Sequence, residues 1–389
     1  MAKIPLIVIG GIGYSKVFLG EGDKTAWPPQ LEIEDFKRDF MGLFLKMSLF
    51  RKDSGFSSKL SELFASCISP FAADENGDLL CRSLYVEQDV TGHDKQALLQ
   101  RLAVEDLFSQ AGDENCFVFS YVFAEDPLVN GKKLCAFIES VCERTGSDKV
   151  RLLCIGCGST VVTAYLAQPE AARRLDRLVF CFSPLNGTLL ASDLFLDSFD
   201  YTASRQFLSW MLKKEDAQMF AQLDDMIPGL LENAAEKIFT AVRDLFMTQP
   251  AAWALCPSDD YADLAEEFLS ANGTLREKTD AFAVLREALP STLVKLRDSG
   301  VKVSLLCGSA NRFIPLTQSQ DVVSDTLVNT SSAALNESIA EIADPVNAVV
   351  DAAAGVLAGD TYYFPGVVHM KAMHTPAVKE MLVKLLLQD

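Results

Sequence analysis

Residues 150–167, VRLLCIGCGSTVVTAYLA, constrain the fold of this chain more than any other stretch. The stretch begins as an apolar run typical of a fully buried strand, turns at four small residues, and continues as an apolar pattern of helical length. A strand, a tight turn and a helix are the context of the G-x-S-x-G nucleophile elbow, whose strained backbone exposes a serine above a sheet. The small residues are present here, but no serine lies where the pattern requires it.

Three registers of this turn remain open. If Gly156 is the first small residue, Gly158 occupies the nucleophile position and the elbow has no nucleophile. If the helix sets the register, Cys157 is the nucleophile and Ser159 is the second small residue, but Ile155 is then large where a small side chain is needed. In the third register Ser159 is the nucleophile, and a valine at the second small position makes this the poorest steric fit. The sequence therefore predicts an elbow without fixing its nucleophile.

Further apolar runs fit buried strands and alternate with helical patterns, which favours a mainly parallel sheet. The runs are residues 4–9, 117–123, 178–182, 301–307 and 361–364, and the clearest helical patterns are residues 98–108, 131–143 and 375–387. We therefore expect an α/β protein with the α/β-hydrolase fold, in which helices flank a mostly parallel central sheet.

The character of the chain changes between residues 190 and 290, which read as helical, acidic and rich in Leu, Phe and Met. We expect this segment to be a helical cap or lid inserted into a core domain formed by residues 1–189 and 291–389. An amphipathic segment within residues 27–70 predicts a helix packed on that core. Residues 333–358 are rich in alanine and predict a further helical excursion.

A general base and its carboxylate partner are the clearest candidates for catalytic residues. His369 is one of only three histidines and follows the last predicted strand, where an α/β-hydrolase carries its base. A carboxylate is needed to orient that base and to stabilise the imidazolium. Asp325 is best placed, because Asn311 cannot supply the charge and Asp360 is separated from His369 by a strand. The order of elbow, acid and histidine is that of α/β-hydrolases.

Two other short motifs do not predict a cofactor or a metal. The turn Gly10-Gly11-Ile12-Gly13 follows the first strand, but the third glycine of a dinucleotide fingerprint is missing in either register. It is better read as a tight turn or as a loop whose backbone N–H groups face the nucleophile. Cys154 and Cys157 form a C-x-x-C pair, but no second Cys/His pair has metal-ligand spacing. A dinucleotide-dependent oxidoreductase is thus the weakest interpretation.

Charge restricts the partners of this 389-residue chain. Its formal net charge is −18 and its pI is about 4.7, so its surface repels nucleic acid phosphates and anionic lipid headgroups. No apolar run approaches the length of a membrane span, and the N-terminal run is too short for a signal sequence. Ten cysteines lie mostly within apolar runs without framework spacing. We expect a cytoplasmic protein without nucleic acid partners or stable membrane insertion.

Several segments together resemble the lecithin:cholesterol acyltransferase-like family of α/β-hydrolases. They are VIGGIGYSKVFL, FVFSYVFAEDP, SPLNGT, QPAAWALCPSDDY, SDTLVNTSSA and PGVVHMKAM. The resemblance implies that Gly11 and the residue after the nucleophile, Gly158 if Cys157 attacks, supply the oxyanion hole. It also places the family's acid on Asp325 and its histidine on His369. In the second segment, valine and alanine replace the family's Asp and Arg.

Two functions follow from these residues and this resemblance. In the first, the protein acts on acyl esters as a lipase, esterase or O-acyltransferase: Cys157 or Ser159 attacks the carbonyl, His369 transfers the proton and Asp325 orients His369. Its substrate would be a small-molecule ester or a soluble or micellar lipid. In the second, the protein is catalytically inactive and binds a ligand or a partner in the old cleft. The divergent elbow GCGST favours the second function, and retention of the acid and base favours the first.

Overall fold

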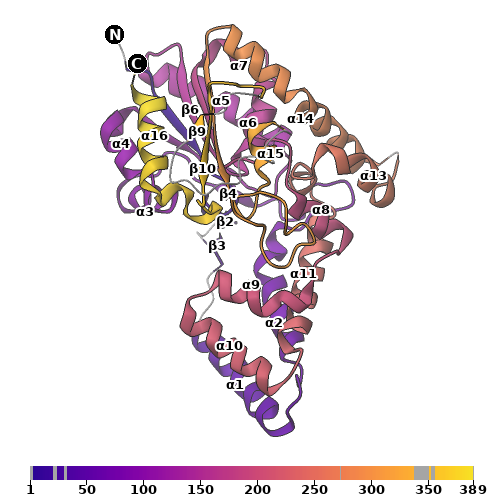
Figure 1. The fold of residues 1–389 in the computed structure, drawn as a ribbon. Coiled ribbons are helices and arrows are strands. Elements are labelled where there is room, and N and C mark those ends of the chain that lie inside the picture. Colours follow the sequence, from indigo (N-terminus) through magenta and orange to yellow (C-terminus); the bar gives the residue numbers. More distant parts are fainter. Residues whose placement is uncertain are drawn as a thin grey trace.

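A seven-stranded sheet forms the centre of the part of the chain that the computed structural model describes, namely residues 3–20, 24–29, 33–271, 273–336, 350–351 and 355–388 (Figure 1). Its strand order is β5-β1-β6-β7-β8-β10-β9, with β1 Leu6–Ile9, β5 Cys116–Phe119, β6 Val150–Ile155, β7 Leu175–Cys181, β8 Lys302–Ser309, β9 Val350–Asp351 and β10 Thr361–Pro365. Neighbouring strands from β5 to β10 are parallel, and β9 is antiparallel to β10. This order confirms the predicted α/β-hydrolase fold.

Helices cover both faces of the sheet, and for this reason its strands are continuous apolar runs rather than alternating ones. One face packs against α5, α6 and α14, and the other against α3, α4 and α16. These helices are α3 Gly92–Leu102, α4 Glu105–Ala111, α5 Pro127–Thr145, α6 Gly158–Leu166, α14 Thr274–Asp298 and α16 Pro376–Leu387. With both faces covered, the carboxyl ends of the parallel strands are the expected place for a ligand.

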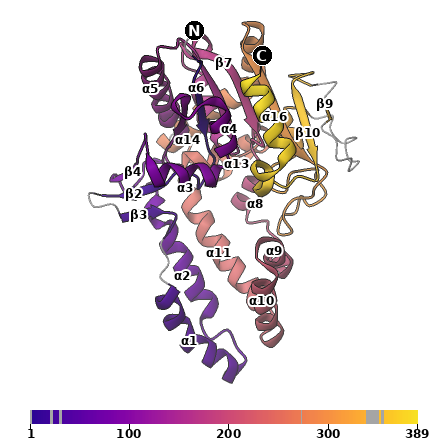
Figure 2. The ribbon, with the colours of Figure 1, turned by 90° about the vertical axis from the view of Figure 1, so that its left-hand side faces the viewer.

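A second helical body projects from the sheet domain as an arm, as Figures 1 and 2 show. It contains α1 Ile33–Phe50, α2 Phe56–Ile68, α9 Ser204–Met211, α10 Lys214–Met226 and α11 Leu230–Phe246. Phe40 and Phe56 are buried there against Ile227 and Leu230, which belong to the segment predicted to be an insertion. The helix expected within residues 27–70 therefore packs on the insertion and not on the core. Its amphipathic pattern correctly predicts a buried face but does not identify the partner of that face.

The remaining elements connect these two bodies or line their edges. The α-helices among them are α7 Ala171–Arg174, α8 Leu189–Leu196, α12 Pro250–Trp253, α13 Ser258–Phe268 and α15 Thr330–Ala334. The 3₁₀ helices are η1 Ser69–Phe71, η2 Asp113–Asn115, η3 Tyr201–Ala203 and η5 His369–His374. A small antiparallel sheet consists of β2 Val17–Leu19, β3 Lys24–Trp27 and β4 Leu84–Val86. None of the helices described is both long and apolar enough to cross a bilayer.

Two predicted boundaries can be compared with these elements. The predicted end of the insertion at residue 290 falls inside α14, whose later residues Leu289, Leu293 and Leu296 belong to the core cluster against the sheet. The helical excursion predicted for residues 333–358 lies largely outside the described residues. Of that stretch, the structure describes the end of α15 and the edge strand β9.

Gly131 fixes the spacing between α5 and α6, the helix that follows the elbow. A Cβ at Gly131 would lie 2.6 Å from the Cβ of Ala164 and 2.9 Å from the backbone nitrogen of Tyr165. Gly131→Ala is therefore expected to lower the free energy of unfolding by about 1–3 kcal/mol, as overpacking does elsewhere. Gly42→Ala is the matched control, since no described atom lies within 4 Å of the Cβ that it adds to α1. Urea unfolding in which Gly131→Ala matches Gly42→Ala would contradict this account.

Candidate active site

An aspartate and a histidine meet at the carboxyl edge of the sheet. Asp325 follows β8, His369 follows β10, and these two strands are neighbours. The Nδ1 atom of His369 lies 2.8 Å from Oδ2 of Asp325, and the His369 backbone N–H donates to the Asp325 carbonyl oxygen at 2.7 Å. The structure thus brings together the two residues that the sequence selects as base and acid.

The loop around Asp325 holds its carboxylate in one orientation. Oδ1 accepts hydrogen bonds from the backbone N–H groups of Leu327 at 3.0 Å and Val328 at 2.8 Å. Asp325 is only 1% exposed, so these bonds are not exchanged with bulk water. Thr326 has a φ of 93°, a strained conformation for a β-branched residue. Strain of this kind persists where the surrounding contacts impose it, here beside the candidate acid.

The Asp325 carboxylate also sets the proton affinity of His369. Burial by itself would lower the pKa of His369, but the negative charge of Asp325 and its hydrogen bond outweigh burial, so the pKa lies above its ordinary value. The Asp325 contact occupies Nδ1, which leaves Nε2 to face the elbow. His369 is therefore positioned to take up a proton from a group at the elbow.

Gly156 occupies the tip of the elbow. It follows β6 directly and has a φ of +54°, the left-handed conformation that the elbow imposes on its nucleophile. A Cβ built on Gly156 would lie 3.4 Å from Nε2 of His369 and 3.7 Å from its Cε1. Apart from the neighbours of Gly156 in the chain, no other described atom lies within 4 Å of that position. The residue that faces the base is thus a glycine.

This geometry corrects the three registers considered from the sequence. The elbow reads CIGCG, with Cys154 and Gly158 at its small positions and Gly156 at its tip. A Cβ on Gly158 would lie 2.8 Å from the carbonyl oxygen of Gly10 and 2.9 Å from that of Ile9. Gly158 therefore allows α6 to approach β1, and it occupies neither the nucleophile position nor the position after it.

Cys157 and Ser159 lie beside the tip rather than at it. Cys157 has helical backbone angles, with φ −65° and ψ −6°, and the nearby Ile12 backbone N–H favours its thiolate form without outweighing burial. Burial raises the pKa of the Cys157 thiol to about 12, so it is protonated at neutral pH and a poor nucleophile. Ser159 is 2% exposed within α6, and its hydroxyl has no partner among the described residues.

The loop after β1 packs closely on the elbow. A Cβ on Gly11 would lie 3.2 Å from both the backbone nitrogen of Cys157 and the carbonyl oxygen of Ile155. The backbone N–H of Ile12, in the same loop, lies near the Cys157 thiol. Because Cys157 follows the tip residue, its own N–H occupies the position of the second donor of an oxyanion hole. Gly11 thus allows the loop to pack closely on the elbow, and the two candidate N–H donors are those of Ile12 and Cys157.

Other candidate residues have structural contacts. The side-chain amide of Asn311 donates to the carbonyl oxygen of Val367 at 3.0 Å and so ties the end of β8 to the loop before His369. Val122 and Ala124 are buried in an apolar cluster with Val17. Within the described ranges, no group of three His, Cys, Asp or Glu side chains is arranged to hold a metal ion.

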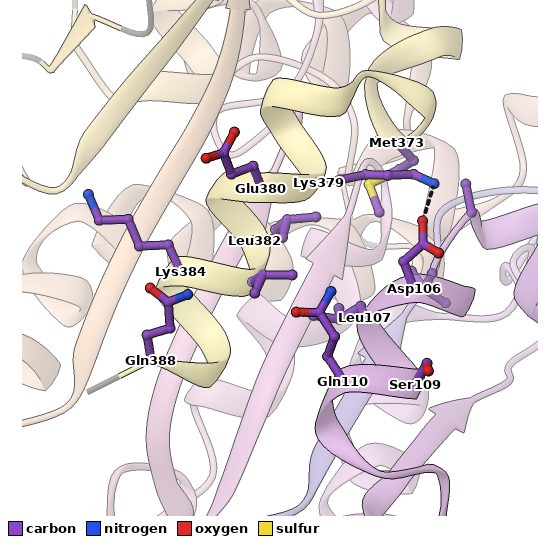
Figure 3. A pocket seen from close by; sticks show the side chains of 13 residues that line it. Asp106, Leu107, Ser109, Gln110, Met373, Lys379, Glu380, Leu382, Lys384 and Gln388 are labelled. Atoms are coloured by element: carbon purple, nitrogen blue, oxygen red, sulfur yellow. Dashed lines mark hydrogen bonds and ion pairs between the residues drawn. The ribbon is translucent and has the colours of Figure 1, made fainter.

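A cavity of about 520 Å³ lies between α4 and α16, on the outer side of the sheet domain (Figure 3). Lys379 and Asp106 form an ion pair across it at 3.1 Å. Met373, from the same 3₁₀ helix as His369, also lines it. Neither His369 nor the elbow contributes to its wall, so this cavity is separate from the Asp325–His369 pair.

No family model and no curated protein matches this sequence. Solved structures with related backbones include lipase BlEst2 of Bacillus licheniformis, with a TM-score of 0.36 and 12% identity over 74% of this chain and 86% of that one. The lin2722 gene product of Listeria innocua has a TM-score of 0.32 and 12% identity over 100% and 95% of the two chains. The Tle4–Tli4 complex gives a TM-score of 0.43 and 11% identity over 99% of both. The fold assignment rests on the strand order described above.

Proposed function

We propose that this protein binds and acts on an acyl ester at the carboxyl edge of its sheet, as a lecithin:cholesterol acyltransferase-like α/β-hydrolase whose elbow carries no side-chain nucleophile. The observation that carries the proposal is the position of Gly156, which faces Nε2 of His369 where a nucleophile would stand. The order along the chain of the Gly11 loop, the elbow, Asp325 and His369 supports the family assignment.

The contacts at the elbow suit an ester carbonyl. The N–H groups of Cys157 and Ile12 would hold the carbonyl oxygen, and the carbonyl carbon would then lie over Gly156 beside His369. The Ile12 N–H lies near the Cys157 thiol, so a bound carbonyl oxygen would compete with the thiol for this N–H. The raised pKa of Cys157 makes a thiol nucleophile a weaker explanation than a glycine tip.

A second candidate is a protein that binds such a ligand and does not turn it over. The same glycine favours it, because covalent catalysis at the elbow requires an attacking side chain. The two candidates share the ligand and its place in the cleft. They differ only in whether the wild-type protein shows turnover.

Binding of an ester analogue tests the shared part of the proposal. We expect alkyl methyl ketones of increasing chain length to raise the melting temperature and to bind with measurable affinity by calorimetry. Gly11→Ala should weaken binding at least about tenfold, since its Cβ would crowd the Cys157 N–H. Cys157→Ala should bind as well as the wild type or better, because the Ile12 N–H becomes free.

Gly42→Ala is the control for a glycine substitution away from the cleft. If no ketone binds to the folded wild type, or if Gly11→Ala binds as tightly as Gly42→Ala, the proposed ligand site is contradicted. Loss of binding in Cys157→Ala would instead support a direct role of the thiol.

A further inference from the structure

We infer that the wild-type protein hydrolyses its ester in a single displacement, with a water molecule in the side-chain space above Gly156 as the nucleophile and His369 as its general base. This inference rests on the proposed function, since it needs an acyl ester at the elbow. It adds an activity that requires neither the Cys157 thiol nor the Ser159 hydroxyl.

The geometry around Gly156 supports this assignment. Nε2 of His369 lies 3.4 Å from the position of the absent Cβ, and no other described atom beyond the neighbours of Gly156 in the chain crowds that position. A water oxygen within hydrogen-bond reach of Nε2, about 2.6–3.2 Å, would occupy the same volume. A serine or cysteine at position 156 would fill that volume, so the glycine is what makes it accessible to water.

The remaining polar groups of the site match the needs of such a reaction. Asp325 holds His369 through Nδ1 and leaves Nε2 for the water. Gly156 is buried, and the His369 side chain is only 19% exposed, so a water at this place is held against the base. The backbone N–H groups of Cys157, beside Gly11, and of Ile12, near the Cys157 thiol, are the donors that would hold the carbonyl oxygen.

The reaction balances without an added oxidant, metal or acyl-enzyme. The water oxygen attacks the carbonyl carbon, one water proton moves to Nε2 of His369, and the carbonyl π electrons form the oxyanion. The oxyanion then collapses, the bond from carbon to the alcohol oxygen breaks, and the leaving alkoxide takes the proton from Nε2. The products are a carboxylic acid and an alcohol, and His369 returns to its neutral form.

Hydrolysis of p-nitrophenyl butyrate by the full-length wild type and a set of variants tests the inference. We expect slow steady-state turnover without a burst, lost about 10²-fold or more in His369→Ala, as for other general bases. Gly156→Ala should lose turnover as well, although it removes no catalytic group, because its methyl group occupies the place of the water. His374→Ala, at the exposed end of the same 3₁₀ helix, is the matched histidine control and should keep full turnover.

Covalent probes distinguish attack by water from attack by a side-chain nucleophile. Wild-type turnover should resist both a fluorophosphonate and iodoacetamide. Equal rates in the wild type and in folded His369→Ala would overturn the inference, as would inactivation by either probe. If the wild type stays at background while Gly156→Ser hydrolyses the ester, the inference fails and the ester site stands. If both stay at background and no ketone binds, the proposed function itself fails.

Discussion

Gly156→Ser is expected to turn this protein into an esterase that forms an acyl-enzyme. The new hydroxyl would extend from a Cβ that lies 3.4 Å from Nε2 of His369, within reach of the base that must activate it. Since loss of a nucleophile costs many orders of magnitude in established triads, we expect kcat for p-nitrophenyl butyrate to rise by at least about 10²-fold. A pre-steady-state burst of p-nitrophenol should accompany the gain.

The backbone limits the stability of this variant without forbidding it. A serine at φ +54° adopts a left-handed conformation, which costs about 1–2 kcal/mol. Gly156→Ala carries the same strain without a hydroxyl and is therefore the matched control. The account is contradicted if both variants are folded and Gly156→Ser hydrolyses the ester no faster than Gly156→Ala.

The esterase activity gained in Gly156→Ser is expected to depend on the Asp325–His369 pair. Adding His369→Ala or Asp325→Asn to Gly156→Ser should lower kcat about 10³- to 10⁴-fold, because the hydroxyl then loses its base or the base loses its orientation. The 2.8 Å contact between Nδ1 and Oδ2 predicts that the two effects are not additive. Additive losses would indicate that Asp325 and His369 act separately.

The pH profile of Gly156→Ser gives an independent check on the pair. His369 acts as a base only when neutral, and Asp325 raises its pKa, so kcat/KM should rise with pH through an inflection above the ordinary value of about 6.5. Replacing Asp325 by asparagine removes the charge that raises the pKa. The inflection should then move to lower pH, and an unchanged inflection would contradict the assignment of His369 as the base.

The pairing of Asp325 with His369 was predictable from the sequence, and the elbow register was not. Asp325 and His369 each follow a strand, and in a parallel sheet the carboxyl ends of neighbouring strands meet at one edge. At the elbow, four small residues follow one another from Gly156 to Ser159, so several registers satisfy the steric rule. Only the positive φ of Gly156 and the direction of its missing Cβ towards His369 distinguish among them.

The packing partners of the helices in the arm could not be predicted from the sequence either. Apolar spacing predicts helices in residues 27–70 and in the insertion, and the strands of the sheet are evident as apolar runs. Periodicity identifies a buried face but not the element that buries it. Phe40 and Phe56 therefore pack against Ile227 and Leu230, residues more than 150 positions away in the chain, a pairing that spacing alone does not reveal.

Reaction of Gly156→Ser with a fluorophosphonate, read by intact mass and peptide mapping, tests whether position 156 is the nucleophile position of the elbow. We expect one adduct per chain, on the hydroxyl introduced at position 156, that is absent from the wild type and from the double variant with His369→Ala. An adduct on Cys157 or Ser159, or equal labelling of the wild type, would show that the nucleophile position lies elsewhere in the elbow.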